Sequence, residues 1–145
     1  MIATYSIVRT RFSRYNRLYF NNELPIPKLC VEKTYEYFGQ FTYRKNKDGS
    51  IRWQKLCVSS YFDFTEEELL DVIVHEMIHY YLMYKGVDMK LTHGKNFKRI
   101  KNDFNLKYGM RIKIKCRVNQ YKRADNAPLL PWIFMVVIGY LMFWR

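Results

Sequence analysis

The chain has 145 residues, a formal net charge of +12 and an aromatic share of 18%. This length suits a single domain, and the composition excludes a collagen-like, low-complexity or disordered chain. Its cysteines, Cys30, Cys57 and Cys116, are odd in number and far apart in the sequence. They indicate neither a disulfide framework nor a cysteine-type metal site, and they fit a reducing, cytoplasmic location.

The first half of the chain predicts one helix followed by strands. Residues 2–21 carry apolar side chains at helical spacing, and two prolines follow shortly afterwards. Runs rich in β-branched and aromatic residues then occur at 29–33, 37–43 and 51–59. Because a polar turn sequence joins the last two runs, we expect a small antiparallel sheet.

A second helix is predicted to begin at Glu66. Thr65 and Glu68 have the spacing of a capping box, in which each side chain accepts a hydrogen bond from the backbone N–H of the other residue. The apolar residues that follow fit a largely buried helix, and Gly86 is a typical helix stop.

This helix carries His75, Glu76 and His79, and His93 follows, so every histidine of the chain lies in one short window. On a helix, residues four apart lie on the same face, so His75 and His79 can bind one metal ion. Three protein ligands leave one position of a zinc ion to water, which the metal acidifies and a neighbouring carboxylate deprotonates. The pattern predicts one Zn²⁺ ion bound by His75, His79 and His93, with Glu76 as the catalytic general base.

Other interpretations of these residues are open. Asp88 or Asp103 could be the third ligand, but His93 is preferred because an apolar-periodic segment follows it. A helix there could pack on the first one and present His93 to the ion. The histidines could also be core residues with backbone partners, and Glu76 could be a solvated carboxylate.

The predicted sheet also suggests how a substrate binds. An edge strand beside the metal would pair with an extended polypeptide without demanding particular side chains. Gly39 and Gln40 are the candidate substrate-strand residues, because a glycine eases the close approach of another backbone. A β-bulge or a packing requirement explains Gly39 equally well.

Positive charge is concentrated between Lys85 and Arg123, where 13 Lys/Arg stand against two aspartates, a local net charge of +11. The candidate nucleic-acid-binding residues, which we name the cationic strip, are Lys95, Lys98, Arg99, Arg111, Lys113, Lys115 and Arg117. The last four alternate with apolar residues, so a basic strand would present them on one face. Such a strip would hold DNA through its phosphates, whereas a solvated sheet face or a contact with anionic lipid is the alternative.

The run from Leu129 to Trp144 carries no charge. It is shorter than the about 20 apolar residues of a spanning helix and longer than most buried segments, so its length leaves both open. Trp132 and Trp144 bracket the run like interfacial aromatics, and Lys122 and Arg123 precede it. A membrane anchor facing the cytoplasm is therefore predicted, with a packing helix or strand as the alternative.

The stretch His75-Glu76-Met77-Ile78-His79, followed by His93-Gly94-Lys95-Asn96-Phe97, resembles the SprT-like metalloprotease family, which includes proteases of DNA–protein crosslinks. Residues 19–25 and 38–41 add to this resemblance, which covers roughly residues 5–116. It implies that the three histidines bind zinc, that Glu76 is the base, and that the core runs helix, three strands, helix, helix. Bacterial members often continue into a cysteine-rich zinc ribbon, for which this chain has no CxxC pair.

These observations predict an α+β fold with one zincin-like domain at residues 1–123 and an apolar tail at 124–145. The domain would contain an N-terminal helix, a small antiparallel sheet, the HExxH helix, a following helix that carries the third histidine, and a basic strand. The predicted function is a zinc-dependent endopeptidase that cleaves proteins bound or crosslinked to DNA, with DNA that is single-stranded or has unpaired regions as a partner. The alternatives are a nucleic-acid- or membrane-binding module with a structural zinc site, and a membrane-anchored general zinc peptidase.

Overall fold

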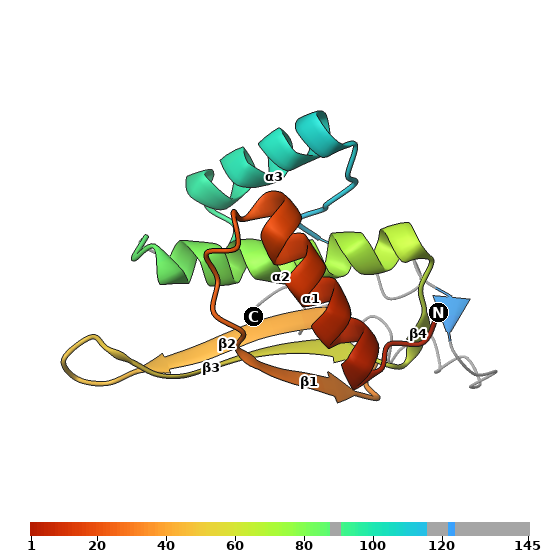
Figure 1. The fold of residues 1–145 in the computed structure, drawn as a ribbon, viewed down its shortest axis with the longest axis horizontal. Helices are drawn as coiled ribbons and strands as arrows, with labels where there is room; N and C mark the ends of the chain where they lie inside the picture. The colour runs from red at the N-terminus through yellow and green to blue at the C-terminus, as the bar shows by residue number, and fades with distance from the viewer. Residues whose placement is uncertain (88–90, 116–121, 124–145) are drawn as a thin grey trace, which may run out of the picture.

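The protein is described from a computed structural model that defines residues 1–87, 91–115 and 122–123 (Figure 1). Its elements in chain order are α1 (Tyr5–Tyr19), β1 (Lys28–Glu32), β2 (Gly39–Lys45), β3 (Ile51–Ser59), β4 (Phe62–Asp63), α2 (Glu66–Tyr84), α3 (Lys95–Tyr108) and β5 (Lys122–Arg123). Within the described residues this is an α+β arrangement of helices and a small mixed sheet, which confirms the predicted fold class.

The main sheet has the strand order β1-β3-β2, so among the described strands β3 is central and both β1 and β2 lie at an edge. β2 pairs antiparallel with β3 through the predicted hairpin, but β1 pairs parallel with β3. The expectation of a purely antiparallel sheet was therefore wrong. The chain runs from β1 to the opposite edge before the hairpin brings β3 between them, and such long-range pairing leaves no local sequence signal.

The helices lie together on one side of this sheet (Figure 1). α1 contacts β1 and α2, α2 contacts β2, and α3 packs on α2. Fully buried apolar side chains fill the space between these layers, among them Val8, Phe12, Leu56, Ile73 and Met77. The centre of α2 is thus enclosed, which is why polar groups on it are informative.

The prediction of a basic strand in the second half of the chain was wrong. Residues 110–115 form no strand; they follow the left-handed C-cap of α3 at Gly109 (φ 66°) as an irregular segment. The predicted alternation survives in the burial, because Met110 and Ile112 are buried whereas Arg111 and Lys113 are exposed. We name residues 110–115 the basic segment. Hydrogen bonds from side chains to its backbone fix this segment, where a strand would be fixed by pairing with another strand.

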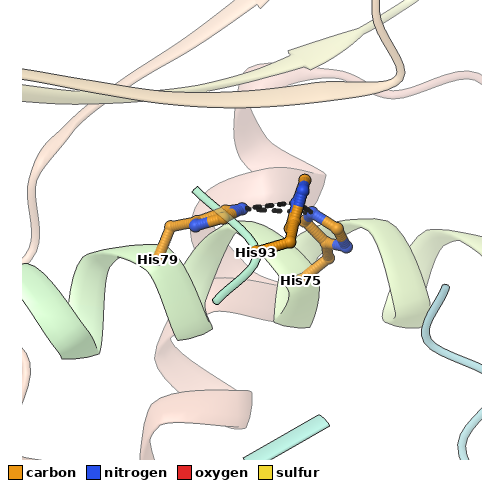
Figure 2. A group of neighbouring side chains, drawn as sticks. All are labelled: His75, His79 and His93. Atoms are coloured by element: carbon orange, nitrogen blue, oxygen red, sulfur yellow. Dashed lines mark hydrogen bonds between the residues drawn. The ribbon is translucent and has the colours of Figure 1, made fainter. Parts of the chain in front are cut away.

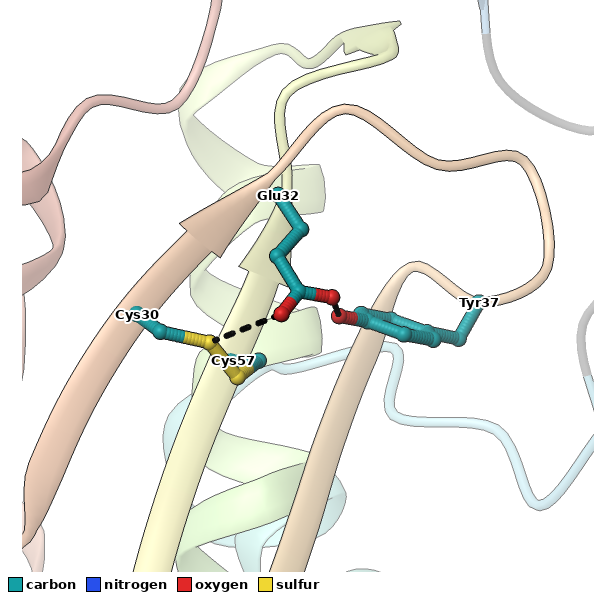
Figure 3. The surroundings of a disulfide bond; sticks show 4 residues. All are labelled: Cys30, Glu32, Tyr37 and Cys57. Atoms are coloured by element: carbon teal, nitrogen blue, oxygen red, sulfur yellow. Dashed lines mark hydrogen bonds between the residues drawn. A yellow bond between two sulfur atoms is a disulfide. The ribbon is translucent and has the colours of Figure 1, made fainter.

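The prediction about the cysteines was also wrong. Cys30 of β1 and Cys57 of β3 are direct partners in the parallel register and form a disulfide, with their Cα atoms 4.5 Å apart (Figure 3). Their separation of 27 residues concealed this proximity, since the pairing of β1 with β3 creates it. Cys116 lies outside the described residues.

The predicted apolar tail, residues 124–145, also lies outside the part of the chain that the structure describes. Among the described helices, none combines the length and apolar character needed to cross a bilayer. The domain boundary at residue 123 and the membrane anchor remain predictions.

Candidate metal centre

The cap of α2 sets the position of the candidate metal ligands on this helix. The helix begins at Glu66 as predicted, and its capping box is complete: Glu68 N–H donates to Thr65 Oγ1 over 3.1 Å, and Thr65 N–H donates to Glu68 Oε2 over 2.7 Å. The cap fixes where the helix starts, so His75 and His79 lie one turn apart on the same face.

The three histidines converge on one point (Figure 2). Each pair among His75, His79 and His93 brings its Nε2 atoms to 3.2 Å. A tetrahedral zinc ion with bonds of 2.0–2.1 Å separates its nitrogen ligands by about 3.3–3.4 Å. The donor set therefore fits one zinc ion.

His93 completes this set from a different place than expected. It lies in the turn at residues 91–94, just before α3 begins at Lys95, so the following helix does not itself carry the third histidine. The turn is closed by Gly94 N–H, which donates to Leu91 C=O over 3.1 Å. Among the described residues, Asp103 does not belong to the donor cluster, and Asp88 lies outside them.

The tautomer of His75 is set by the basic segment. His75 Nδ1 lies 2.8 Å from the backbone carbonyl of Lys113, which can only accept. Nδ1 therefore carries the proton, and Nε2 keeps the lone pair that a metal needs. This contact fixes the orientation of the His75 ring through the nitrogen that does not face the other histidines, as the outer partners of metal-binding histidines commonly do.

Two side chains hold the basic segment against this ligand. Asn105 of α3 forms a two-point clamp on Ile112, since its Nδ2 donates to the Ile112 carbonyl and its Oδ1 accepts from the Ile112 N–H, each over 3.0 Å. Asp71 of α2 accepts from Arg111 N–H over 3.1 Å. The Lys113 carbonyl is thus positioned by hydrogen bonds on the two residues that precede it.

Phe97 packs beneath all three ligands. Its ring centroid lies 4.9 Å from that of His75, 4.5 Å from that of His79 and 4.8 Å from that of His93, and the side chain is 1% exposed. The ring excludes water from this side of the imidazoles and restricts their orientation.

The electrostatics keep the ligands neutral. Burial, with the nearby His93, lowers the pKa of His75 to about 3, and burial, with both other histidines, lowers the pKa of His79 to about 2. Burial also lowers the pKa of His93. Neutral imidazole is the form that binds a metal, so the site is prepared for an ion near neutral pH.

Glu76 is buried next to these ligands, at 8% exposure. Burial raises its pKa to about 8, against the opposing effect of a hydrogen bond from the Phe41 backbone N–H. A Cβ on Gly39 would lie 2.9 Å from both Glu76 Cγ and Val72 Cγ1. The missing side chain at Gly39 therefore leaves the space through which Glu76 reaches β2.

The structure shows what surrounds Gly39 and Gln40, and their predicted contact with a substrate strand stays a prediction. The close approach that Gly39 permits is that of the protein's own helix, which is the packing alternative. Ser59 N–H donates to Phe38 C=O, and with the antiparallel register this directs the backbone groups of Gln40 toward β3. The backbone N–H and C=O groups of alternate residues point to the opposite side of β2, away from β3. These residues are Gly39, Phe41 and Tyr43.

The structure divides the cationic strip into parts. Lys98 on α3 and Lys115 on the basic segment are close enough to His93 to lower its pKa, whereas Arg111 and Lys113 lie near Asp71. Lys95 and Arg99 are exposed on α3, and Arg117 lies outside the described residues. Positive charge therefore borders the metal centre beside its third ligand.

Sequence reasoning missed Asn105, Asp71 and the contact role of Phe97. The only available signal for Phe97 was its spacing four residues after His93. Asn105 and Asp71 gave no signal, since their partners are backbone groups that fold next to them.

The three histidines form a cluster that could hold a metal ion, on an α+β fold. The chain belongs to the SprT-like family, whose model matches residues 8–117. That family is generally associated with zinc metallopeptidase activity. No curated protein and no solved structure matches the chain.

Proposed function

We propose that this chain is a zinc-dependent endopeptidase that cleaves proteins bound or crosslinked to DNA. The observation that carries the proposal is the convergence of three histidine Nε2 atoms at 3.2 Å, with buried Glu76 on the helix that carries two of them. Within the described residues the cluster holds three donors, the number typical of catalytic zinc, whereas structural zinc sites use four protein ligands.

Each residue then has a defined task. A zinc ion bound by the histidines supplies a Lewis acid that acidifies water and polarises the scissile carbonyl. In its ionised form, Glu76 accepts a proton from the attacking water and passes it to the leaving amine. The Phe41 N–H, which donates to Glu76, orients its carboxylate, and the Lys113 carbonyl holds His75 in the binding tautomer.

The free edge of β2 is the proposed substrate site. An extended polypeptide would pair there with the outward backbone groups of Gly39 and Tyr43 and with the Phe41 carbonyl, while the Phe41 N–H stays bonded to Glu76. Because Glu76 receives its hydrogen bond at Phe41, this edge runs past the catalytic carboxylate. Pairing through the backbone accepts many sequences, which suits an enzyme that acts on varied proteins.

The proposed DNA contact lies at Lys98 and Lys115, beside His93. Phosphate contacts need no base sequence and would concentrate DNA-bound proteins at the metal centre. The local net charge of +11 between Lys85 and Arg123 supports this partner.

The direct test is cleavage of a DNA-crosslinked protein by the zinc-loaded enzyme, with and without single-stranded DNA, beside the Glu76→Gln variant. Cleavage that needs both DNA and Glu76 is the expected result. Cleavage without DNA would indicate a general peptidase. Bound zinc without any cleavage would instead favour a binding module with a structural metal.

A further inference from the structure

We propose that Cys30 and Cys57 form a reversible redox site that controls the sheet beneath the metal centre. This site lies on β1 and β3 and shares no residue with the metal ligands (Figure 3). It rests on the placement of two sulfur atoms and one carboxylate, independently of the proposed peptidase activity.

The two sulfurs differ in accessibility. Cys57 on the central strand is 1% exposed, whereas Cys30 on the edge strand is half-buried. A small thiol can therefore reach Cys30 Sγ in the folded protein, and Cys57 is the leaving group. This asymmetry is typical of a pair that can turn over without unfolding.

Glu32 is positioned to serve the reduced form. Its Oε1 lies 3.9 Å from Cys30 Sγ, and its Oε2 accepts a hydrogen bond of 2.6 Å from the Tyr37 hydroxyl (Figure 3). A disulfide sulfur has no proton to donate, so the carboxylate has a use for this proximity only after reduction, when the Cys30 S–H can donate to it.

The reaction is ordinary thiol–disulfide exchange. A small-molecule thiolate attacks Cys30 Sγ, the S–S bond breaks, and Cys57 leaves as a thiolate that takes up a proton. A second thiolate displaces Cys30 from the mixed disulfide, and Cys30 takes up the second proton. Two thiols are oxidised to one small-molecule disulfide, and the protein gains two electrons and two protons.

The disulfide lies at the base of the loop that leads to Gly39. Beyond Cys30, the carbonyl of Glu32 accepts from Ser60 N–H over 2.9 Å, and the carbonyl of Thr34 accepts from the Ser59 hydroxyl. Residue 39 then begins β2 against Glu76. Opening the disulfide removes the covalent tie of β1 to β3 and loosens this connection to the strand that supports Glu76.

The experiment measures the redox state of Cys30 and Cys57 and the mobility of the loop that leads to Gly39. The folded zinc-loaded protein, carrying Cys116→Ser to remove the third thiol, is equilibrated in buffers with varied ratios of reduced to oxidised glutathione. It is then alkylated, and mass spectrometry reads Cys30 and Cys57. We expect both to become alkylated together while the protein stays folded, and amide exchange over residues 33–39 to rise several-fold.

Two variants sharpen the test. Glu32→Gln weakens the acceptor of the Cys30 S–H, so it should lower the reduced-to-oxidised ratio about fivefold in the same buffer. Tyr37→Phe keeps the carboxylate and should shift the ratio less. Cys30→Ser should show the fast exchange of the reduced protein in every buffer.

Three outcomes would overturn the proposal. Alkylation that begins only when the protein unfolds would mean a permanent staple. Thiols that never pair in the most oxidising buffer would mean that no disulfide forms. The donor atoms of Cys30, Cys57 and Glu32 lie within 4.8 Å of one another, so a second equivalent of zinc that Cys30→Ser abolishes would mean a metal site instead.

Discussion

Two parts of the metal centre are built by different means. Helix α2 places His75, Glu76 and His79 through helical spacing, starting from a complete capping box. The basic segment has no regular structure, and its Lys113 carbonyl reaches His75 because Asn105 and Asp71 hold its backbone. Local helical spacing therefore places the candidate ligands of α2 on one face. The orientation of the His75 ring depends on a hydrogen bond with a residue far away in the sequence.

The chain offers an internal reference for the second mechanism. Asn16 near the end of α1 clamps Leu24 as Asn105 clamps Ile112: its Nδ2 donates to Leu24 C=O over 2.8 Å and its Oδ1 accepts from Leu24 N–H over 3.2 Å. The two clamps share their geometry, but of the two it is the Asn105 clamp that holds a segment in contact with a metal ligand.

The largest expected effect tests the local part. Glu76→Gln removes the proton acceptor and should lower the peptidase rate roughly 10²- to 10⁴-fold, while zinc content stays at that of the wild type. Glu67→Gln, an exposed carboxylate in the first turn of the same helix, is the control and should keep full activity. A Glu76→Gln enzyme with near-normal rate would remove Glu76 from the mechanism.

The next effect tests the long-range part. Asn105→Ala should weaken zinc binding roughly 10- to 100-fold in a chelator competition, because the Lys113 carbonyl is no longer held against His75. Asn16→Ala is the matched control: it should cost roughly 1–3 kcal/mol in the free energy of unfolding and leave zinc affinity unchanged. Equal zinc affinity in both variants would show that the clamp has no special link to the metal.

A third variant tests the contact between the two layers of the site. Gly39→Ala introduces a Cβ 2.9 Å from Glu76 Cγ, which should cost roughly 1–3 kcal/mol of stability and displace the carboxylate. Urea unfolding and the peptidase rate measure the two effects. Gln40→Ala, on the adjacent residue, should leave the rate intact; a normal rate in Gly39→Ala would show that Glu76 tolerates the added methyl group.

The smallest effect concerns the cationic strip. Replacing Lys98 and Lys115 by alanine should reduce the slope of log K against log salt for single-stranded DNA by about 0.7 for each phosphate that is no longer neutralised. Lys47→Ala, in the distant hairpin turn, should leave the slope unchanged. If the variant without Lys98 and Lys115 had the same slope as the wild type, the DNA-binding surface would lie elsewhere.

The sequence predicted what depends on local spacing. It predicted where α2 begins and that the helix ends before Gly86. It also predicted which histidines come together, because caps and the HExxH spacing are local patterns. The parallel pairing of β1, the Cys30–Cys57 disulfide and the irregular basic segment were not predicted. Each depends on partners far away in the sequence, which no periodicity reports.

Phe97 has a consequence for how the protein acquires its ion. It is the first buried residue of α3 after His93, and its ring lies against all three imidazoles. Before α3 docks, the described part of the chain offers only the two histidines of α2, which retain a metal weakly. In the proposed zinc enzyme, tight retention of the ion would therefore require that α3 is already packed against α2.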